Sequence, residues 1–536
     1  MRGSVEANQA DVMRIEAVTA AAEPAIAWLR PLLSATSRLG RRVSEHAAPQ
    51  QRPTQATRPL RILVENSEYW LRNNGDLAML AVTLDRMHQW WPDARIAVLT
   101  DSPCLLRAYF PRAEGISVFD EDPWAPPTRL ERLAGHLGPR MVGPVVLARL
   151  RLRVRRKQLP DRLRAGRRKL LRLALRRPAP AGVPARETAP LPTGPLHPGS
   201  AAAAAQSSLV LALGGGYLTD TDRAQAVRVL NLVEHACDVG VPVALVGQGL
   251  GPLDDPGLQA RAAQVLPKVG LIALREGRQG PQILDRAGVA AERVLVTGDD
   301  AIELAYHARN DEIGSDLGFC LRVAGYAPVP AEVADLIGRV MRSAAAERTA
   351  ALVPLIIAEY RSQDRRSTLP LVRGCADVIA PLPRYVHPVE IARRVARCRV
   401  VVTGAYHLAV FALSQGIPVV ALTSTAYYDD KFLGLGAMFG QGLTLVRLDD
   451  PCLEQTLAMA TDRAWLTAQA VREPLRARAR MQIDASRAAF DRVATLTQAR
   501  ATAPIASPHD HLASAADPAW LPTADEGAAA GTDLPT

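Results

Sequence analysis

The chain of 536 residues lacks several features that would assign it to a particular class of protein. It has no run of about 18 apolar residues, the length that a membrane-spanning helix needs, and its N-terminus lacks the basic-then-apolar pattern of a signal peptide. Its six cysteines are scattered, without a CxxC pair or a cluster with histidine. These absences argue against a disulfide framework and a structural zinc site. We expect a cytoplasmic protein, at most peripheral at the inner face of the membrane.

Aromatic residues are also sparse, at 4%, although a hydrophobic content of 48% is sufficient for sizeable cores. The segment Gly247-Gln248-Gly249-Leu250-Gly251 does not have the GxGxxG spacing of a dinucleotide-binding fingerprint. A redox enzyme is therefore not expected. The sequence indicates neither a metal site nor a bound cofactor.

The positive charge of the chain is concentrated in one segment. Between Arg149 and Arg177 there are 14 Lys/Arg and one acidic residue, Asp161, which gives this segment a balance of +13 within a total of +10. Leucines alternate with the arginines, and such a segment could lie on an anionic membrane or bind nucleic acid. A solvated helical or disordered insertion is the simpler interpretation. If the segment has a partner, we expect the membrane and not nucleic acid.

Short apolar runs alternate with helical patterns along most of the chain. Strands are expected at 60–64 and 208–213, and a helix is expected at 77–90. This alternation predicts an α/β fold with two Rossmann-like domains that face each other across a cleft. The expected parts are an N-terminal extension, partly helical or disordered, at 1–57, a first Rossmann-like domain at 58–122 and 208–308, a basic, Pro/Ala-rich insertion at 123–207, a second Rossmann-like domain at 309–450, C-terminal helices at 451–500, and a disordered tail at 501–536.

One segment predicts where ligands bind. A strand at 400–402 and a tight turn precede a helix that begins at Tyr406 and His407, and a strand at 418–422 leads to a loop with Lys431. Ligands bind at the carboxyl ends of the strands in such a βαβ unit. His407 and Lys431 would lie at that edge, beside a helix N-terminus that favours anions. The pattern predicts a site for a phosphorylated or carboxylated small molecule.

Short motifs follow one another in a fixed order along the two predicted domains: Asn74-Gly75-Asp76, the glycines 214–216 with Asp220, Gly247-Gln248-Gly249, Arg275-Glu276, Gly298-Asp299 with Ala301, Leu321-Arg322, Tyr406-His407, and Lys431 with Gly434-Leu435. Each motif is weak evidence alone, but the ordered series is much stronger. Through these motifs the chain resembles the polysaccharide pyruvyl transferases over roughly residues 60–120 and 208–450. That family moves an enolpyruvyl-derived group from phosphoenolpyruvate to sugar hydroxyls. Its fold is similar to the glycosyltransferase-B type.

The resemblance implies a transferase with phosphoenolpyruvate as donor and with a cell-surface polysaccharide, or its lipid-linked precursor, as acceptor. No cofactor is implied, and the sequence does not indicate an oligomeric state. The phosphate and the carboxylate of the donor must be held, and Arg275 and Lys431 are the first candidates for this clamp, with Arg322 across the cleft. The alternatives are a surface arginine paired with Glu276 and a solvated loop lysine.

Two residues are candidates for proton transfer. His407 could contact the departing phosphate or act as general acid, although a histidine beside an apolar helix is often only structural. Asp76 could serve as acid or base toward the acceptor, or could cap the helix at 77–90 instead. Further substrate contacts are expected from Gly215, Gly216, Asn74 and Asp299, although the glycines could equally serve close packing.

The chain departs from the family pattern at three places. Ala405 stands where the family often has an arginine, the segment 277–280 lacks a serine that is common there, and Asp300 stands where proline is usual. Loss of the arginine removes a bidentate partner for an anion. Two other functions therefore stay open. One is a nucleotide-sugar-dependent glycosyltransferase of the same fold, and the other is a non-catalytic derivative that acts as a binding protein.

Overall fold

Two parallel sheets and the helices that connect their strands make up most of the described chain. The computed structural model describes residues 59–66, 68–118, 120–149, 151–152, 196–324, 327–359 and 364–501, without the side chains of 498–501. The predictions for the N-terminal extension, for the C-terminal tail and for most of the basic segment lie outside the described residues. No helix in the described ranges is long and apolar enough to cross a membrane.

The first sheet contains strands from the first half of the chain. All its pairings are parallel, in the order β3-β2-β1-β4-β6-β7-β8, and β5 pairs with β6. Because β1 has β2 on one side and β4 on the other, the winding direction reverses here, which leaves a crevice at the carboxyl ends of these strands. The strands are β1 (Arg61–Glu65), β2 (Arg95–Leu99), β3 (Glu114–Ile116), β4 (Leu209–Ala212), β5 (Gly215–Leu218), β6 (Val243–Leu250), β7 (Leu271–Leu274) and β8 (Val294–Val296).

Several helices of this half begin at a side chain that satisfies a free backbone N–H group. The Asn73 side chain accepts a hydrogen bond from the Gly75 N–H at 3.0 Å, and Asp222 and Asp255 cap α9 and α10 in the same way. The helices are α4 (Asn74–Trp90), α5 (Pro103–Tyr109), α6 (Arg129–Leu137), α8 (Pro198–Ala205), α9 (Arg223–Asp238), α10 (Pro256–Val265), α11 (Gly280–Arg286) and α12 (Ala301–His307).

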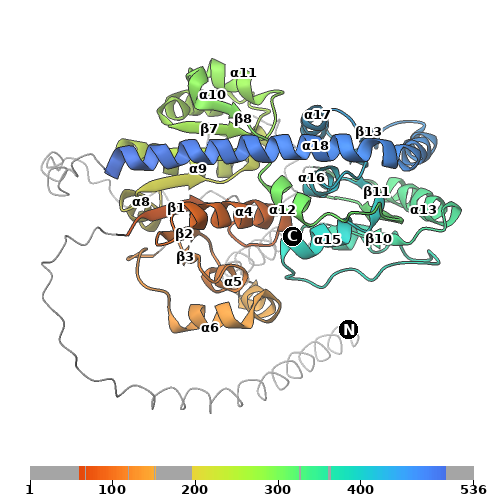
Figure 1. Cartoon of the computed structure of the whole chain (residues 1–536), viewed down its shortest axis with the longest axis horizontal. Coiled ribbons are helices and arrows are strands. Elements are labelled where there is room, and N and C mark those ends of the chain that lie inside the picture. The colour runs from red at the N-terminus through yellow and green to blue at the C-terminus, as the bar shows by residue number, and fades with distance from the viewer. Residues whose placement is uncertain are drawn as a thin grey trace, which may run out of the picture. The chain divides into compact units, whose positions relative to one another are not determined.

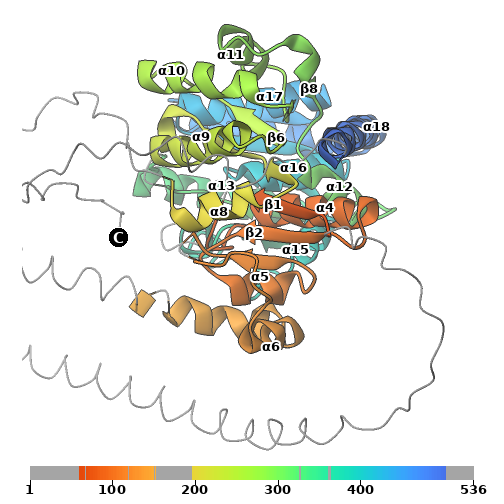
Figure 2. The same cartoon turned by 90° about the vertical axis from the view of Figure 1, so that its left-hand side faces the viewer.

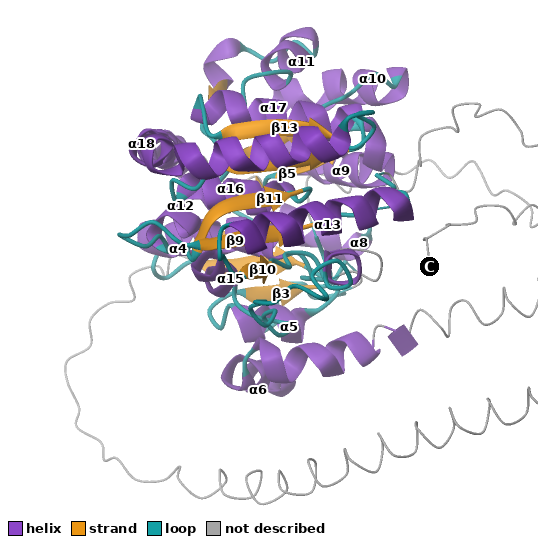
Figure 3. Cartoon of the chain, turned by 90° about the vertical axis from the view of Figure 1, so that its right-hand side faces the viewer, coloured by secondary structure: helices purple, strands orange, loops and turns teal. Residues whose placement is uncertain are grey.

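The second sheet is also parallel, in the order β10-β9-β11-β12-β13. Figure 3 shows its strands in orange between helices. The α/β fold with parallel sheets is therefore confirmed. The strands are β9 (Asp316–Cys320), β10 (Leu352–Pro354), β11 (Cys398–Thr403), β12 (Val419–Thr423) and β13 (Leu443–Arg447), and the helices are α13 (Ala331–Glu347), α14 (Asp364–Thr368), α15 (Pro388–Val395), α16 (Tyr406–Ser414) and α17 (Ala426–Phe439).

A shared hydrophobic core joins the two sheets. Successive residues of a strand point to opposite faces of the sheet, so Ile62 and Val64 pack in the core that contains α4, whereas Leu63 faces α9 on the other side. Val401 of the second sheet belongs to the same core as Ile62, together with the residues of α16. Its neighbour Val402 faces α13. Helix α16, which belongs to this shared core, is buried along its whole length.

The C-terminal segment forms a single helix, α18 (Leu453–Ala501), and not the several helices predicted. It packs against β6 and β7 of the first sheet and against β11, β12 and β13 of the second, as its course in Figure 1 shows in blue. Pro474 lies inside it and removes one backbone hydrogen bond. Tertiary contacts offset this loss, because Leu475 is fully buried and Arg472 and Arg476 both donate to the Asn310 carbonyl oxygen.

Two further segments have regular structure. The glycine-rich segment from Gly247 to Gly251 is mostly the second half of β6, which bends at Gly247 (φ +60°) and then pairs with β5. The described ends of the predicted insertion at 123–207 contain helices, and α6 packs against α5 while α8 packs against α9. These ends belong structurally to the first sheet and its helices.

Arg86 is the centre of a buried polar contact between α4, α12 and α18. Its Nη1 lies 3.4 Å from Asp300 Oδ1 and donates to Ser486 Oγ at 2.8 Å, while its Nε donates to Glu303 at 3.1 Å. The guanidinium also lies 4.7 Å from the ring centroid of Phe490. Asp300 stands where the family that this chain resembles usually has proline, and here it pairs with Arg86.

Substitution of Arg86 by alanine should destabilise the protein strongly. The change would leave Asp300 buried without its cation, and breaking a buried ion pair in this way costs about 3–5 kcal/mol. Arg447→Ala, which removes a more exposed ion pair with Asp449, should change the free energy of unfolding much less. Urea denaturation of both variants measures the difference, and equal losses would contradict the structural role of Arg86.

Candidate functional site

A cavity of about 240 Å³ lies where strands of both sheets end. The first half of the chain contributes residues that follow β1 and β7 and the start of β5. The second half contributes residues that follow β9, β11 and β12. Of the nine predicted site residues, the cavity lining contains Asp76, Gly215, Gly216, Arg275, Arg322, His407 and Lys431.

Arg275 directly follows β7 and points into the cavity. It is only 4% exposed, and its guanidinium lies 4.2 Å from the ring centroid of Tyr406 and 3.8 Å from Asp299 Oδ2. Gly249 makes room for it, because a Cβ there would lie 2.6 Å from Arg275 Nε. The alternative of a surface arginine paired with Glu276 is wrong, since the side chain is buried and its neighbouring carboxylate is Asp299. No described residue accepts a hydrogen bond from this guanidinium, so its N–H groups can bind an anion.

Asp299 lies behind the cavity and does not line it. Its Oδ1 accepts a hydrogen bond from the Ala301 N–H at 3.0 Å. Its Oδ2 lies 3.8 Å from Arg275 Nη1 and 3.7 Å from His407 Nε2, without a hydrogen bond to any described residue. Burial raises the pKa of Asp299 to about 6, although Arg275 opposes this shift. Asp299 can therefore orient these two side chains, but it is not placed to touch a ligand.

His407 is neutral at neutral pH. Burial lowers its pKa well below the usual value, and Arg275, Lys431 and Arg322 lower it further. The ring packs against the backbone of Gly75, where any Cβ would collide with it. A neutral imidazole is better suited to accept a proton than to donate one. This charge state differs from the predicted role of general acid.

Lys431 lies in α17 and not on a loop, because this helix begins at Ala426, soon after β12 ends. Its ammonium group donates a hydrogen bond to the Tyr427 hydroxyl, which in turn donates to the Gly216 carbonyl at 2.8 Å. A Cβ on Gly216 would overlap the end of the Lys431 side chain, so this side chain would have to shift if a larger residue stood there. Burial, with Arg275 next in effect, lowers the pKa of Lys431 well below its usual value.

Asp76 faces the cavity from the first turn of α4. The predicted capping role belongs to Asn73 instead. Burial raises the pKa of Asp76 to about 7, helped by Glu68 and Asp299 and opposed by Arg322. No hydrogen bond or ion pair joins its carboxylate to another described residue. A carboxyl group that titrates near neutral pH can both donate and accept a proton.

Arg322 reaches the cavity from the second sheet, two residues after β9. Its Nε donates to Asp364 Oδ1 at 2.9 Å, and the other oxygen of Asp364 accepts backbone N–H groups from Ile357 and Ala358. The guanidinium is therefore held in place. Ala405, where the family arginine is missing, is fully buried at the start of α16. Arg322 supplies a cation to the same half of the cavity.

Asn74, like Asp299, is a predicted substrate contact that does not line the cavity. It is buried in α4 and its N–H donates to the Ile357 carbonyl at 2.8 Å, whereas its neighbour Asn73 lines the cavity. Tyr427 was not predicted. Its position four residues before Lys431 would have indicated the contact if this segment had been expected to be helical.

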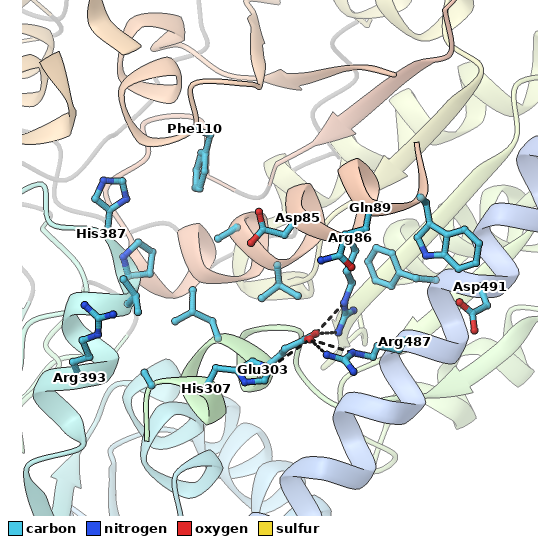
Figure 4. A pocket seen from close by; sticks show the side chains of 18 residues that line it. Asp85, Arg86, Gln89, Phe110, Glu303, His307, His387, Arg393, Arg487 and Asp491 are labelled. Atoms are coloured by element: carbon cyan, nitrogen blue, oxygen red, sulfur yellow. Dashed lines mark hydrogen bonds and ion pairs between the residues drawn. The ribbon is translucent and has the colours of Figure 1, made fainter. Parts of the chain in front are cut away.

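The largest cavity described, of about 810 Å³, lies elsewhere (Figure 4). Faces of α4, α12, α15 and α18 line it, and strand ends do not. Its central charges neutralise one another, since Glu303 accepts hydrogen bonds from Arg86 and Arg487. The smaller cavity is therefore the better candidate for an anion site, in spite of its size. In the described ranges no group of three or more His, Cys, Asp or Glu residues could hold a metal ion.

Solved structures similar to this chain include sugar-nucleotide enzymes. They include an S. aureus MnaA–UDP co-structure (12% identity, TM-score 0.47, 83% of this chain and 99% of that chain) and a UDP-GlcNAc 2-epimerase from Neisseria meningitidis bound to UDP-GlcNAc (12%, 0.44, 82% and 100%). The glycotransferase of kitacinnamycin is a further example (12%, 0.42, 82% and 100%). A comparison with curated proteins found no match.

The sequence profile of one family covers most of the chain and includes nearly all the cavity residues named above. The family is described as polysaccharide pyruvyl transferase, and its profile matches residues 73–425. The matched range contains Asp76, Arg275, Arg322 and His407, and it ends shortly before Lys431. The chain belongs to the polysaccharide pyruvyl transferase family.

Proposed function

We propose that the protein transfers a pyruvyl group from phosphoenolpyruvate to two hydroxyls of a sugar, as a ketal, on a cell-surface polysaccharide or its lipid-linked precursor. The observation that carries this proposal is the grouping of Arg275, Arg322 and Lys431 around one small cavity with Asp76 and His407. Phosphoenolpyruvate carries a phosphate and a carboxylate on one carbon. A site for it needs cations on more than one side, and groups that titrate near its enol carbon.

Arg275 and Lys431 would hold the phosphate, and Arg322 would bind the carboxylate from the other side. Binding of the anionic donor would offset the repulsion among these three side chains. Burial lowers the pKa of His407 and of Lys431, and the neighbouring cations lower both further. A bound anion would oppose the effect of these cations and raise both pKa values. Donor binding should therefore favour the charged form of Lys431.

The chemistry requires that one proton reaches C3 of the donor and that two hydroxyl oxygens bond to C2 while phosphate leaves. Asp76, with a pKa of about 7, can carry its proton to C3 and then accept one from an attacking hydroxyl. The neutral His407 can accept the proton of the other hydroxyl and pass it to the departing phosphate. One of the two hydroxyl protons replaces the proton that Asp76 gives to C3, and the other ends on the departing phosphate, so the reaction balances.

Incubation with phosphoenolpyruvate and glycan acceptors tests the proposed function directly. We expect release of inorganic phosphate that depends on the acceptor, together with a new ketal methyl signal in the proton NMR spectrum of the glycan. Release of UDP or GDP from a nucleotide sugar instead would favour the glycosyltransferase alternative. Binding of the donor without turnover by any acceptor would favour a binding protein.

Replacement of Arg275 by lysine should weaken donor binding. Lysine keeps the charge but loses the planar pair of N–H donors, so the KM for phosphoenolpyruvate should rise roughly tenfold or more. The matched control is Arg95→Lys, which changes an arginine paired with Glu114 away from the cavity. Steady-state kinetics with varied donor measures both. An unchanged KM in the Arg275 variant would argue against its role as the clamp.

Replacement of Asp76 by asparagine should remove activity and stabilise the protein at high pH. The pKa of Asp76 rises from 3.8 to about 7 on folding, so above pH 7 the folded state contains a buried charge that costs free energy. Between pH 7 and pH 3.8 the folded state keeps the proton of Asp76, so the free-energy cost of folding falls as the pH falls. The Tm of the variant should therefore exceed that of the wild type at pH 8 and approach it near pH 4.

The same variant should lose roughly 10²–10⁴-fold in kcat if Asp76 transfers protons. Asp85→Asn on the same helix is the control, since Asp85 lines the other cavity. Equal shifts in Tm at both pH values would show that the carboxyl group of Asp76 is not buried as described.

A further inference from the structure

A surface on α6 and the helical residues after it carries large apolar side chains that no other described element covers. We call this surface the α6 face. Residues 139–149 and 151–152 are helical and follow α6 after Gly138. The exposed fractions on the α6 face are 67% for Leu130, 41% for Leu133, 41% for Leu137, 64% for Met141, 69% for Val145 and 51% for Leu152.

The apolar residues follow helical spacing on the outer side of both helices. Met141, Val145 and Leu152 fall on one side of the second helix, because their separations of four and seven residues match its turns. The opposite side of this helix is already buried, with Val142 in a small core that also contains Ala134 of α6. A helix that is packed on one side normally presents polar residues on the other. The second apolar side therefore indicates a partner.

The charge of the α6 face is positive. Within 129–152 there are five arginines and one acidic residue, Glu131, whose carboxylate accepts the Thr128 N–H in a capping box. One of the arginines, Arg140, pairs with Glu390 of α15, so four arginines remain against Glu131. The chain then continues into the segment between Arg149 and Arg177 that carries a balance of +13. Figure 2 shows α6 on the side of the fold away from α10 and α11. An anionic partner fits this surface.

We infer that the α6 face binds the surface of an anionic lipid bilayer, with its leucine, methionine and valine side chains inserted among the lipids and its arginines at the phosphates. Aliphatic residues with flanking basic residues are typical of helices that lie in a membrane interface. Surfaces that bind single-stranded nucleic acid without sequence preference use aromatic residues for stacking, and no Phe, Trp or Tyr lies within 129–152. A second copy is disfavoured because the two positive faces would repel each other. This inference does not depend on the proposed reaction.

Sedimentation of the full chain with lipid vesicles tests the inference. The protein should bind vesicles that contain phosphatidylglycerol and should bind pure phosphatidylcholine vesicles weakly. The triple variant Leu133→Glu, Met141→Glu, Val145→Glu should lower the partition coefficient for the anionic vesicles at least about tenfold. Each change removes an exposed apolar side chain that the bilayer would bury and adds a negative charge. Any binding that remains should disappear in high salt, because only basic residues would support it.

The matched control places the same substitutions on another exposed apolar set. Met459, Leu466 and Met481 of α18 are exposed by 63%, 79% and 60%, and their joint replacement by glutamate should leave vesicle binding at the wild-type level. Equal thermal unfolding of both triple variants would show that they fold.

Three results would overturn the inference. The two triple variants could bind vesicles equally, which would assign all binding to the basic segment. The wild type could bind RNA or DNA more tightly than vesicles, or it could self-associate in a way that the α6-face variant abolishes.

Discussion

The buried carboxylate of Asp299 connects the two halves of the protein at the cavity. It faces Arg275 at the end of a strand in the first sheet and His407 at the start of a helix in the second. A buried carboxylate is costly unless cations or donors lie beside it, and the Arg275 guanidinium offsets part of this cost. The backbone of Gly75 then closes against the His407 ring. The position of Asp76, one residue later, follows from the same packing.

This arrangement holds three cationic side chains around a cavity before any ligand is bound. Burial, and after it the neighbouring cations, lower the pKa values of Lys431 and His407, and the pKa of Asp76 is raised to about 7. Such a site is less stable than one of neutral residues, but it need not rearrange its dipoles and charges when an anion enters. The cost in stability and the proposed affinity for a doubly anionic donor therefore have the same cause.

Much of this site could be predicted from the sequence because strand ends and helix starts define the edge of a parallel sheet. His407 is predicted at that edge from the apolar runs, whereas Arg275 and Arg322 are candidates through the resemblance to the family. Lys431 was expected on a loop, since its helix contains two glycines and two aspartates and shows little periodicity. The role of Asn73 as the cap, in place of Asp76, depended on backbone geometry that spacing does not reveal. The contact of Asp299 with His407 joins segments more than 100 residues apart, and no local pattern indicates it.

Neither the family nor the fold demonstrates the reaction, which is the central claim. Transfer carried out in D₂O tests it most directly, because ketal formation adds one solvent-derived proton to C3 of phosphoenolpyruvate. If Asp76 delivers this proton, the methyl group of the product ketal should contain one deuterium, and the Asp76→Asn variant should form the ketal roughly 10²–10⁴-fold more slowly. A product without a ketal methyl group, or a glycan extended by a sugar with release of a nucleotide, would contradict the proposed function.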